Sequence, residues 1–417
     1  MPVTSPRRIE TTCCIVGGGP AGLMLGYLLA RAGIRVTVLE KHADFLRDFR
    51  GDTIHPSTLE LLHELGLLKA FLKLPHEELR RVEVSFNGNR FVGPDFSHLP
   101  THCKFIAFMP QWDFLDFIAA HTAQFPTFEL LRCANVNGLL ETEGRITGVR
   151  ASTPDGSVEV HAHLTIGADG RASAVRELAG MVPDELGVPI DALWLKISKH
   201  GQKEPKPLFH IGNGRMLITI DRNDYWQCGL VIAKGAFAKI REDGLDAFRE
   251  QLAATAPMTR LGAAEITSWD QVFLLTVQIN RLRKWYREGL LCIGDAAHAM
   301  SPAGGVGINL AIQDAVATAN LLTGKLHHGA VVSEDLRRVQ QRREFPVRMT
   351  QALQVLAHRR LTSVTRDGRA NIELPRAALF LLSLLAPLLR RIAARVIGIG
   401  FRAEHISNVA DATAQFV

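Results

Sequence analysis

Three glycines near the N-terminus have the spacing of a phosphate-binding turn. Gly17, Gly19 and Gly22 lie in CCIVGGGPAG, between an apolar run and a stretch with helical periodicity. The first glycine allows a tight turn, the second lets a pyrophosphate approach the backbone, and the third lets the helix pack closely. The helix N-terminus, at Pro20 and Ala21, would face the phosphates. We predict that these five residues bind a dinucleotide; a glycine-rich turn without a ligand is the alternative.

A carboxylate follows at the distance that such a site needs. Glu40 ends the next apolar run, VTVLE, and Lys41 comes directly after it. A glutamate at the end of the second strand accepts hydrogen bonds from ribose hydroxyls, which suits an unphosphorylated ribose, as in FAD or NAD. We therefore predict that Glu40 and Lys41 also belong to the cofactor site, and these residues alone do not separate the two cofactors.

A second group of small residues lies far along the chain, in GDAAHAMSPAGGVGINLA from Gly294 to Ala311. It follows a short apolar run and leads into a helical pattern. Glycines at this density indicate that something flat or phosphorylated lies against the backbone. A loop kept small only for packing is the alternative. The residues predicted to contact the cofactor here are Gly294, Asp295, Gly304, Gly305, Gly307, Ile308 and Asn309.

A parallel sheet is needed to bring these two groups together. Residues 12–16 and 35–39 read as strands and residues 21–32 as the helix between them, which is a βαβ unit. A further helix is expected over 58–68. Strand–turn–helix patterns return in HLTIGADGRASAVRELAG and over 290–322. Alternating apolar and polar residues at 80–96 and 183–277 predict an antiparallel second layer, and the chain is helical and Arg-rich from 335 onward.

The sequence thus predicts an α/β fold with a Rossmann-like cofactor domain, an inserted antiparallel β-sheet substrate domain and a helical C-terminal region. The cofactor domain is expected in three parts, at 1–79, 100–182 and 278–334. The substrate sheet would come from 80–99 and 183–277, and the helical region from 335–417.

Composition excludes several other classes of protein. The 417 residues carry a net charge of +6 without a nucleic-acid recognition motif, so no nucleic-acid partner is expected. The six cysteines form no CxxC pair, which predicts no metal site and a reducing, cytoplasmic location. The N-terminal residues are too polar for a signal peptide, and no apolar run is long enough to span a membrane. The oligomeric state is left open.

The motifs together resemble those of the FAD-dependent monooxygenases related to p-hydroxybenzoate hydroxylase. In that family the aspartate of the GD motif binds the ribityl chain, and the following loop passes the flavin ring; Asp295 and Pro302 hold those positions. IGADGRASAVR resembles the family's Asp-Gly motif, with Asp169 and Arg176 near the FAD pyrophosphate and NAD(P)H. Arg171 and Arg176 could bind the nicotinamide phosphates. The alternative is that Asp169 and the two arginines only pair with each other and stabilise the fold.

Two further cofactor contacts follow from the same resemblance. Arg50, in DFRGDTIHPSTLELL, aligns with an arginine that contacts FAD in the family, and Gln111, in MPQWDFL, aligns with a glutamine or arginine beside the cofactor. The alternatives are a surface arginine and a helix-capping glutamine. FAD is expected to bind non-covalently.

The resemblance implies a monooxygenase in which NADH or NADPH reduces FAD and O₂ gives a flavin C4a-hydroperoxide. Its oxygen would pass to an apolar aromatic, polycyclic or quinone-like small molecule. The family's catalysis rests on the cofactor, with the protein supplying a dry pocket and stabilising charge on the flavin. The alternatives are an FAD-linked reductase of an isoprenoid double bond, a non-catalytic flavin-binding protein, and a peripheral membrane protein with a vestigial site.

The predicted sheet should carry the substrate site. Its candidate residues are Trp194, His210, Tyr225, Trp226 and Gln227. Pro302, Trp226 and, as a base, His210 are the predicted catalytic residues. Because a strand alternates faces, Trp226 and Gln227 cannot both point at the flavin. The W-x-W-x-I-P motif of the halogenases is absent, and so are the tyrosines and arginine that hold a benzoate, which puts a small aromatic acid in doubt.

The C-terminal stretch LPRAALFLLSLLAPLLRRIAARVIGIGFR is apolar with paired arginines. It predicts a helical cover over an apolar substrate cavity, with a membrane-surface helix as the alternative. Pro387 is expected to kink or end the helix in its middle.

Overall fold

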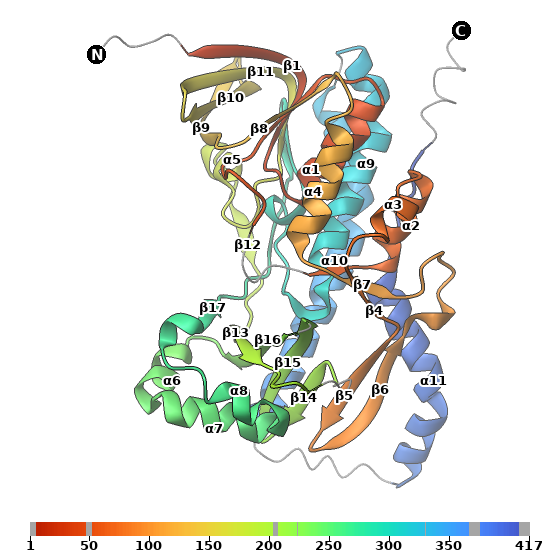
Figure 1. The fold of residues 1–417 in the computed structure, drawn as a ribbon. Coiled ribbons are helices and arrows are strands. Elements are labelled where there is room, and N and C mark those ends of the chain that lie inside the picture. Colours follow the sequence, from red (N-terminus) through yellow and green to blue (C-terminus); the bar gives the residue numbers. More distant parts are fainter. Residues whose placement is uncertain are drawn as a thin grey trace.

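The computed structural model describes residues 6–46, 52–202, 207–222, 224–329, 331–366 and 376–407. Two large sheets organise these residues, one above the other in the view of Figure 1. Arg50, one of the predicted cofactor contacts, lies outside the described residues.

The first sheet has eight strands and a parallel centre. Its main order is β19 (Tyr286–Arg287), β20 (Leu290–Cys292), β11 (Gly156–Gly167), β1 (Arg7–Val16), β2 (Val36–Leu39) and β8 (Phe128–Leu131). Strands β20, β11, β1, β2 and β8 pair in parallel, while β9 (Asn135–Thr142) and β10 (Arg145–Thr153) extend β11 as antiparallel neighbours. The predicted βαβ unit is confirmed, because α1 (Pro20–Arg31) joins β1 to β2.

Helices α1, α4 (Gln111–Thr122) and α9 (Gly307–His327) pack side by side against this sheet (Figure 1). Their apolar faces form the largest core with the buried side of the strands. Burial of this surface is the main stabilising contribution, and it holds the N-termini of α1 and α9 near the carboxyl ends of β1 and β20.

The second sheet has seven strands drawn from two parts of the chain. Its order is β17 (Phe273–Leu275), β13 (Ile190–Ser198), β16 (Tyr225–Ala233), β15 (Arg215–Arg222), β14 (Phe209–Gly212), β5 (Arg81–Phe86) and β6 (Asn89–Asp95). All pairs are antiparallel except β5 and β14, which are parallel. The predicted antiparallel layer therefore needs one correction, because two separate antiparallel units meet at that junction.

Smaller elements complete the description. Residues 237–263, predicted as part of the sheet, form α6 (Phe237–Asp243), α7 (Leu245–Thr255) and α8 (Arg260–Ala263). The small sheets are β3 (Thr53–Ile54), β7 (Ile106–Phe108) and β4 (Glu77–Leu79), and β12 (Pro183–Glu185) with β18 (Asn280–Leu282). The remaining helices are α2 (Pro56–Glu64), α3 (Leu68–Phe71), α5 (Ala174–Leu178), α10 (Ser333–Arg366) and α11 (Arg376–Gly398), with 3₁₀ turns at 96–98, 257–259, 269–271, 294–296 and 303–305.

Two predicted helix boundaries differ from the structure. The helix predicted over 58–68 ends as α2 at Glu64, because Gly66 adopts a left-handed backbone with φ of 73°, and α3 follows separately. Pro387 does not end the predicted helix, because α11 continues through it, and a kink at this residue stays a prediction. Pro387 is exposed, so the backbone carbonyl that it leaves without an intrahelical donor can bind water.

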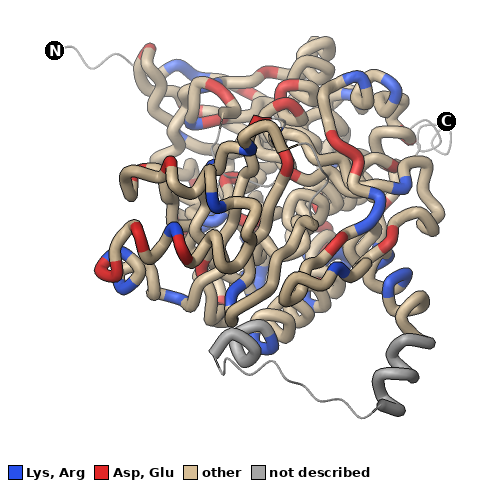
Figure 2. Tube along the Cα trace, turned by 60° about the horizontal axis from the view of Figure 1, so that its bottom comes forward, with Lys and Arg blue, Asp and Glu red and all other residues tan. Residues whose placement is uncertain are grey.

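Lys and Arg positions are interspersed with Asp and Glu positions along the trace in Figure 2. No helix within the described residues is both long enough and apolar enough to cross a membrane.

Candidate functional site

The turn between β1 and α1 contains two glycines that the fold itself requires. Gly17 has φ of 108°, and a Cβ there would overlap the backbone of Ala168. A Cβ on Gly22 would overlap the carbonyl oxygen of Gly17. Close packing of the helix on the strand therefore explains both residues without any ligand.

Gly19 has no such explanation. It is the N-cap of α1, its φ is −78°, and no atom of the described residues lies within 4 Å of where its Cβ would be. No described side chain caps the first turn of α1 either. A phosphate bound to these backbone N–H groups accounts for both observations, since it would satisfy the donors and needs the space that a side chain would occupy.

Glu40 is held beside this turn by two backbone donors. Its carboxylate oxygens accept the N–H of Gly18 at 2.9 Å and the N–H of His42 at 3.0 Å, and the residue is only 8% exposed. The position next to Gly18 agrees with the predicted contact to a ribose. Lys41, the neighbouring predicted contact, is exposed.

A buried ionic group that the sequence did not predict anchors the GD motif. The carboxylate of Asp314, on α9, accepts the N–H of Gly294 at 3.0 Å and contacts His298 at 2.6 Å and Arg343 at 3.0 Å. These interactions outweigh burial and lower the pKa of Asp314. Arg343, on α10, also donates to Glu404 at 3.1 Å, so the C-terminal segment is tied to the motif.

Asp295, the acid of that motif, is paired with an arginine from the third motif. Its Oδ2 accepts Nε of Arg171 at 2.9 Å, and Arg171 also donates to the carbonyl oxygen of Met300 at 3.1 Å. The Asp295 side chain keeps 29% of its surface exposed. The predicted contact with a ribityl hydroxyl thus stays a prediction, with Arg171 as an added neighbour.

The proline–glycine loop, residues 302–307, contains glycines of two kinds. Gly304 and Gly305 have positive φ of 81° and 64°, and a Cβ on Gly305 would overlap the hydroxyl of Thr53. Gly307 has no atom of the described residues within 4 Å of its Cβ position. Packing against Thr53 therefore explains Gly305 without a ligand, and the predicted contact of Gly305 with the cofactor stays a prediction.

Asn309, predicted to contact the cofactor, has its side chain directed into the protein. Its Oδ1 accepts the N–H of His55 at 3.2 Å and the hydroxyl of Thr58 at 2.6 Å. Its Nδ2 donates to the carbonyl oxygen of Gly305 at 3.4 Å, and Thr53 donates to the same carbonyl at 3.1 Å. The Asn309 side chain is therefore bonded within the protein, and the N–H groups available to a ligand are those of the backbone in the first turn of α9, which no described side chain caps.

The Asp-Gly motif makes mainly internal contacts. Asp169 accepts the hydroxyl of Ser173 at 2.5 Å and the N–H of Val175 at 3.1 Å, which caps α5. Burial nonetheless raises the pKa of Asp169. Arg176 donates to the carbonyl oxygens of Ala296 and Arg171, at 3.1 and 2.6 Å. These contacts favour the structural alternative for Asp169 and Arg176, and their cofactor contacts remain predictions.

Gln111 lies at the start of α4, beside an acid that the sequence analysis missed. Asp52 accepts a hydrogen bond from the backbone of Gln111 and pairs with Arg222, at the end of β15. Burial raises the pKa of Asp52, and Arg222 opposes this effect. Arg222 also donates to Gln227 at 3.2 Å, so this buried pair joins the seven-stranded sheet to the strand β3 that contacts Gly305.

Two predicted catalytic residues lie on the face of the seven-stranded sheet that packs against α7. Trp226 is 1% exposed and packs with Phe248 and Leu252 of α7, in the core on the outer side. His210 pairs across the strands with Leu217 of the same core, and its Nε2 lies 3.2 Å from the hydroxyl of Thr219. Sequence patterning alone does not tell which face each residue takes, and the catalytic roles of Trp226 and His210 stay predictions.

The opposite face carries Trp194 and Gln227. Trp194 stacks over Gly229, whose Cβ would lie 3.3 Å from the indole ring, and it belongs to the core between this sheet and β7. The indole Nε1 is buried with no hydrogen-bond partner among the described residues. Tyr225, the last predicted residue on this sheet, packs its ring under the Lys196 ammonium at 5.5 Å.

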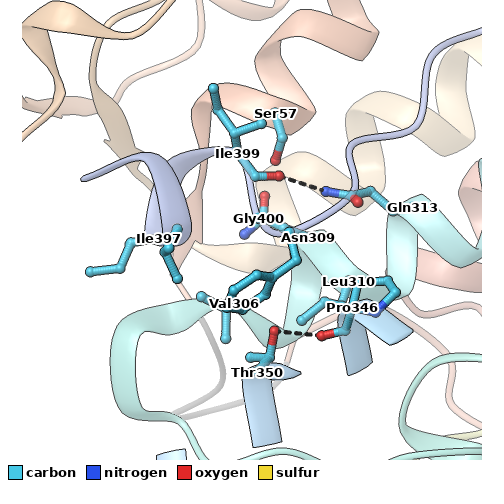
Figure 3. Close-up of a pocket in the computed structure, with 12 residues that line it drawn as sticks. Ser57, Val306, Asn309, Leu310, Gln313, Pro346, Thr350, Ile397, Ile399 and Gly400 are labelled. Carbon is cyan, nitrogen blue, oxygen red and sulfur yellow. Dashed lines mark hydrogen bonds between the residues drawn. The ribbon is translucent and has the colours of Figure 1, made fainter. Parts of the chain in front are cut away.

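A small hollow lies behind the start of α9, where α10 and the end of α11 meet (Figure 3). It is lined by residues that include Val306, Asn309, Gln313, Thr350, Ile397 and Ile399. The carbonyl oxygen of Ile399 accepts Gln313 at 3.4 Å, and that of Ile397 lies 2.8 Å from Nδ1 of His55. The end of α11 therefore packs behind the proline–glycine loop.

The rest of α11 has a buried side and an exposed side. Ala394 is fully buried in the core with Phe96 and Val82. Leu385, Leu388, Leu389 and Ile392 form an exposed apolar stripe on one side of the helix, each at least 39% exposed. Packing at its C-terminal end agrees with a cover, and the membrane-surface alternative stays a prediction.

No group of three or more His, Cys, Asp or Glu residues among those described could hold a metal ion. All six cysteines are free, and burial raises the pKa of the thiols of Cys13, Cys14, Cys228 and Cys292.

The residues of the two glycine segments fit FAD. Gly19 leaves room and free N–H donors for the pyrophosphate, Glu40 is held beside it, and Gly307 leaves room at a second helix N-terminus. Three residues separate the start of α1 from the carboxyl end of β1, and α9 passes the carboxyl end of the parallel strand β20 where Ala311 lies against Gly294, at the edge of the sheet where dinucleotides bind in such folds.

Comparison with known proteins agrees with this site. Residues 10–353 match the FAD binding domain family, and the chain belongs to that family. It is 33% identical over 388 residues to 6-methylpretetramide 4-monooxygenase of Streptomyces rimosus, covering 92% of each chain. It is 29% identical to rifampicin monooxygenase of Streptomyces venezuelae, over 72% of this chain and 61% of that one.

Solved structures share the fold. A probable FAD-dependent monooxygenase from Pseudomonas aeruginosa superposes with a TM-score of 0.72 at 22% identity, over 86% of this chain and 98% of that one. The anhydrotetracycline hydroxylase of Streptomyces rimosus superposes with a TM-score of 0.73 at 22% identity, over 94% and 76%. The chain is an FAD-dependent monooxygenase that uses NAD(P)H and O₂.

Proposed function

We propose that this monooxygenase hydroxylates a polycyclic aromatic molecule. The substrate would lie between the proline–glycine loop and the face of the seven-stranded sheet that carries Trp194, here called the inner face. The observation that carries the proposal is the match over 92% of both chains to a relative named for 6-methylpretetramide. Relatives named for anhydrotetracycline and rifampicin, at 28–29% identity, support a large substrate rather than a small acid.

The inner face of the sheet has the chemistry that such a substrate needs. Trp194 offers a broad apolar ring beside Gly229, and Ile220 and Leu275 belong to the same apolar layer. The unpartnered indole N–H would donate to a carbonyl or phenolic oxygen of the substrate, which removes the cost of leaving that donor buried and unpaired.

Residues of the first sheet and of the helices that follow its strands would bind FAD and orient it. The N–H groups at the start of α1 would hold the pyrophosphate, Glu40 the adenosine ribose, and Asp295 the ribityl chain. The first turn of α9, at Gly307 and Ile308, would stabilise negative charge on the flavin ring through its backbone N–H groups. Bound FAD supplies hydride acceptance from NAD(P)H and activation of O₂. Pro302 and the apolar inner face would exclude water.

Incubation of the holoenzyme with NADPH or NADH, ¹⁸O₂ and anhydrotetracycline tests the reaction. We expect a product with one labelled oxygen atom and little hydrogen peroxide, while 4-hydroxybenzoate gives no labelled product. NAD(P)H-dependent reduction of an isoprenoid double bond without oxygen uptake would support the reductase alternative instead.

Paired tryptophan variants test the substrate face. Trp194→Phe keeps an aromatic ring but removes the N–H, so KM for anhydrotetracycline should rise about tenfold. Trp226→Phe, on the outer face, should lower the melting temperature and leave KM unchanged. The reverse pattern would place the substrate on the other side of the sheet.

A further inference from the structure

A row of buried polar side chains on α10 faces the segment that leads into the proline–glycine loop. Gln351, Gln354 and His358 have the i, i+3, i+7 spacing of one helix face, and none is more than 6% exposed. Amides are costly to bury without partners, so a buried face of this kind needs an explanation.

Gln354 binds this segment through its amide oxygen and its amide nitrogen. Its Oε1 accepts the N–H of Ser301 at 3.1 Å, and its Nε2 donates to the carbonyl oxygens of Ser301 and Ala303, both at 3.0 Å. These bonds enclose Pro302 on both sides. The glutamine thus takes the place of a neighbouring strand for a piece of backbone that belongs to no sheet.

Its two neighbours on the face extend the same contact. Nε2 of Gln351 donates to the carbonyl oxygens of Ala299 at 3.0 Å and Asn280 at 2.8 Å. Nε2 of His358 lies 2.8 Å from the hydroxyl of Ser301, and that hydroxyl accepts the N–H of Ala303 at 3.2 Å. Three side chains of one helix therefore bind the segment from Ala299 to Ala303, Gln351 and Gln354 through its backbone and His358 through the hydroxyl of Ser301.

We propose that Gln354, supported by Gln351 and His358, is a positioning residue. It holds the proline–glycine loop in the position at which the loop contacts the flavin ring. α10 would then contribute to the active site through the backbone of Ser301–Ala303, without contacting FAD. This inference rests on the proposed placement of the ring at the loop.

The chain provides a matched control on the same helix. Gln340 is 8% exposed, and its amide also bridges backbone groups, accepting the N–H of Trp285 at 3.0 Å and donating to the carbonyl oxygen of Arg283 at 2.8 Å. Its partners lie outside the two glycine segments. Gln354→Glu and Gln340→Glu each keep the acceptor and replace the donating nitrogen with oxygen, so they cause similar local damage at different places.

The test is titration of the apoprotein with FAD and, separately, with ADP, which carries only the half of the cofactor that the β1–α1 turn binds. We expect Gln354→Glu to bind FAD about tenfold more weakly, because two donated hydrogen bonds are lost. Its affinity for ADP should stay within about twofold, and the visible circular dichroism of bound flavin should change. Gln340→Glu should match the wild type in all three measurements.

Equal loss of FAD and ADP affinity in Gln354→Glu, or unchanged FAD affinity and dichroism, would overturn the proposal. If a glutamate variant does not unfold cooperatively, the methionine pair, Gln354→Met and Gln340→Met, gives the same comparison. A separate variant checks the placement of the ring: wild-type FAD affinity in Gly307→Val would show that the ring lies elsewhere, which is a failure of the proposed function.

Discussion

Two helix N-termini face the proposed FAD site, and the chain builds them in opposite ways. β1 passes into α1 through three residues, 17–19, whereas β20 reaches α9 through residues 293–306. The short turn is held by atoms close to it in the sheet, with Gly17 against Ala168 and Gly22 against Gly17. The long connection is held by side chains from β3 and α10.

This difference separates local from long-range determinants of the site. A short turn that packs against the ends of adjacent strands needs few residues beyond its own glycines, so a short motif describes most of it. An irregular loop has backbone groups that no neighbouring strand satisfies, and distant residues must supply the hydrogen bonds. Substitutions in the two regions should therefore impair the protein for different physical reasons, and the following variants distinguish them.

The largest effect is expected from Gly22→Val. The side chain would overlap the carbonyl oxygen of Gly17, and neither the strand nor the helix can move away without loss of core packing. We expect a loss of more than about 3 kcal/mol in the free energy of unfolding, measured by urea denaturation of the apoprotein. Gly19→Ala, three residues earlier in an open position, is the control. Equal stability of the two variants would show that the turn is not self-supporting.

The second effect concerns pH and the region behind the loop. Burial lowers the pKa of His55 from 6.5 to about 4, so the ring is neutral in the folded protein. As the pH falls, His55 therefore binds a proton at a higher pH in the unfolded chain than in the folded protein. The free energy of unfolding should fall between pH 6.5 and 4, by at most about 3 kcal/mol. His55→Asn should remove this part of the pH dependence. Parallel stability–pH curves for the two proteins would contradict the prediction.

Gly305→Ala should act on the fold rather than on the cofactor directly. Its methyl group would overlap the hydroxyl of Thr53, and the φ of 64° is unfavourable for alanine. We expect the apoprotein to lose about 2 kcal/mol of stability. The double variant Gly305→Ala/Thr53→Ala makes room for the methyl group and should recover part of the loss. An additive or larger loss would mean that Thr53 is not the neighbour that requires glycine.

A smaller effect is expected at the first region from Glu40→Gln. The amide keeps the size of the side chain but removes the charge offered to the ribose hydroxyls. FAD affinity should fall about tenfold, equivalent to about 1.4 kcal/mol, as measured by equilibrium dialysis. Riboflavin, which has no adenosine, should bind the variant and the wild type equally. A variant that binds FAD normally would restrict Glu40 to its contacts with Gly18 and His42.

The sequence predicted the parts of this molecule that local patterns determine. The βαβ unit and the two glycine segments follow from periodicity and from turn residues, which act within a few positions along the chain. The sheet face on which Trp226 and His210 lie could not be predicted, because alternation shows that two faces exist but not which one α7 covers.

Other features depend on contacts between distant residues. Thr53 against Gly305, Asp52 with Arg222, and Asp314 with Arg343 each join segments that no motif connects. A signal for the α10 contacts was nevertheless present. Gln351, Gln354 and His358 share one face of a long helix with Arg343 and Val347, all of which are buried. Polar side chains on a buried helix face need hydrogen-bond partners, so this spacing indicates contacts with another segment.

The most direct test of the central claim uses Gly307→Val, because neither packing nor backbone conformation among the described residues requires glycine there. The measurement is the melting temperature of the apoprotein together with its dissociation constant for FAD. If the flavin lies against the start of α9, the melting temperature should stay within about 2 °C of the wild type, while FAD binds at least about tenfold more weakly. A variant that melts normally and binds FAD with wild-type affinity would contradict the account, since Gly307 would then make room for nothing.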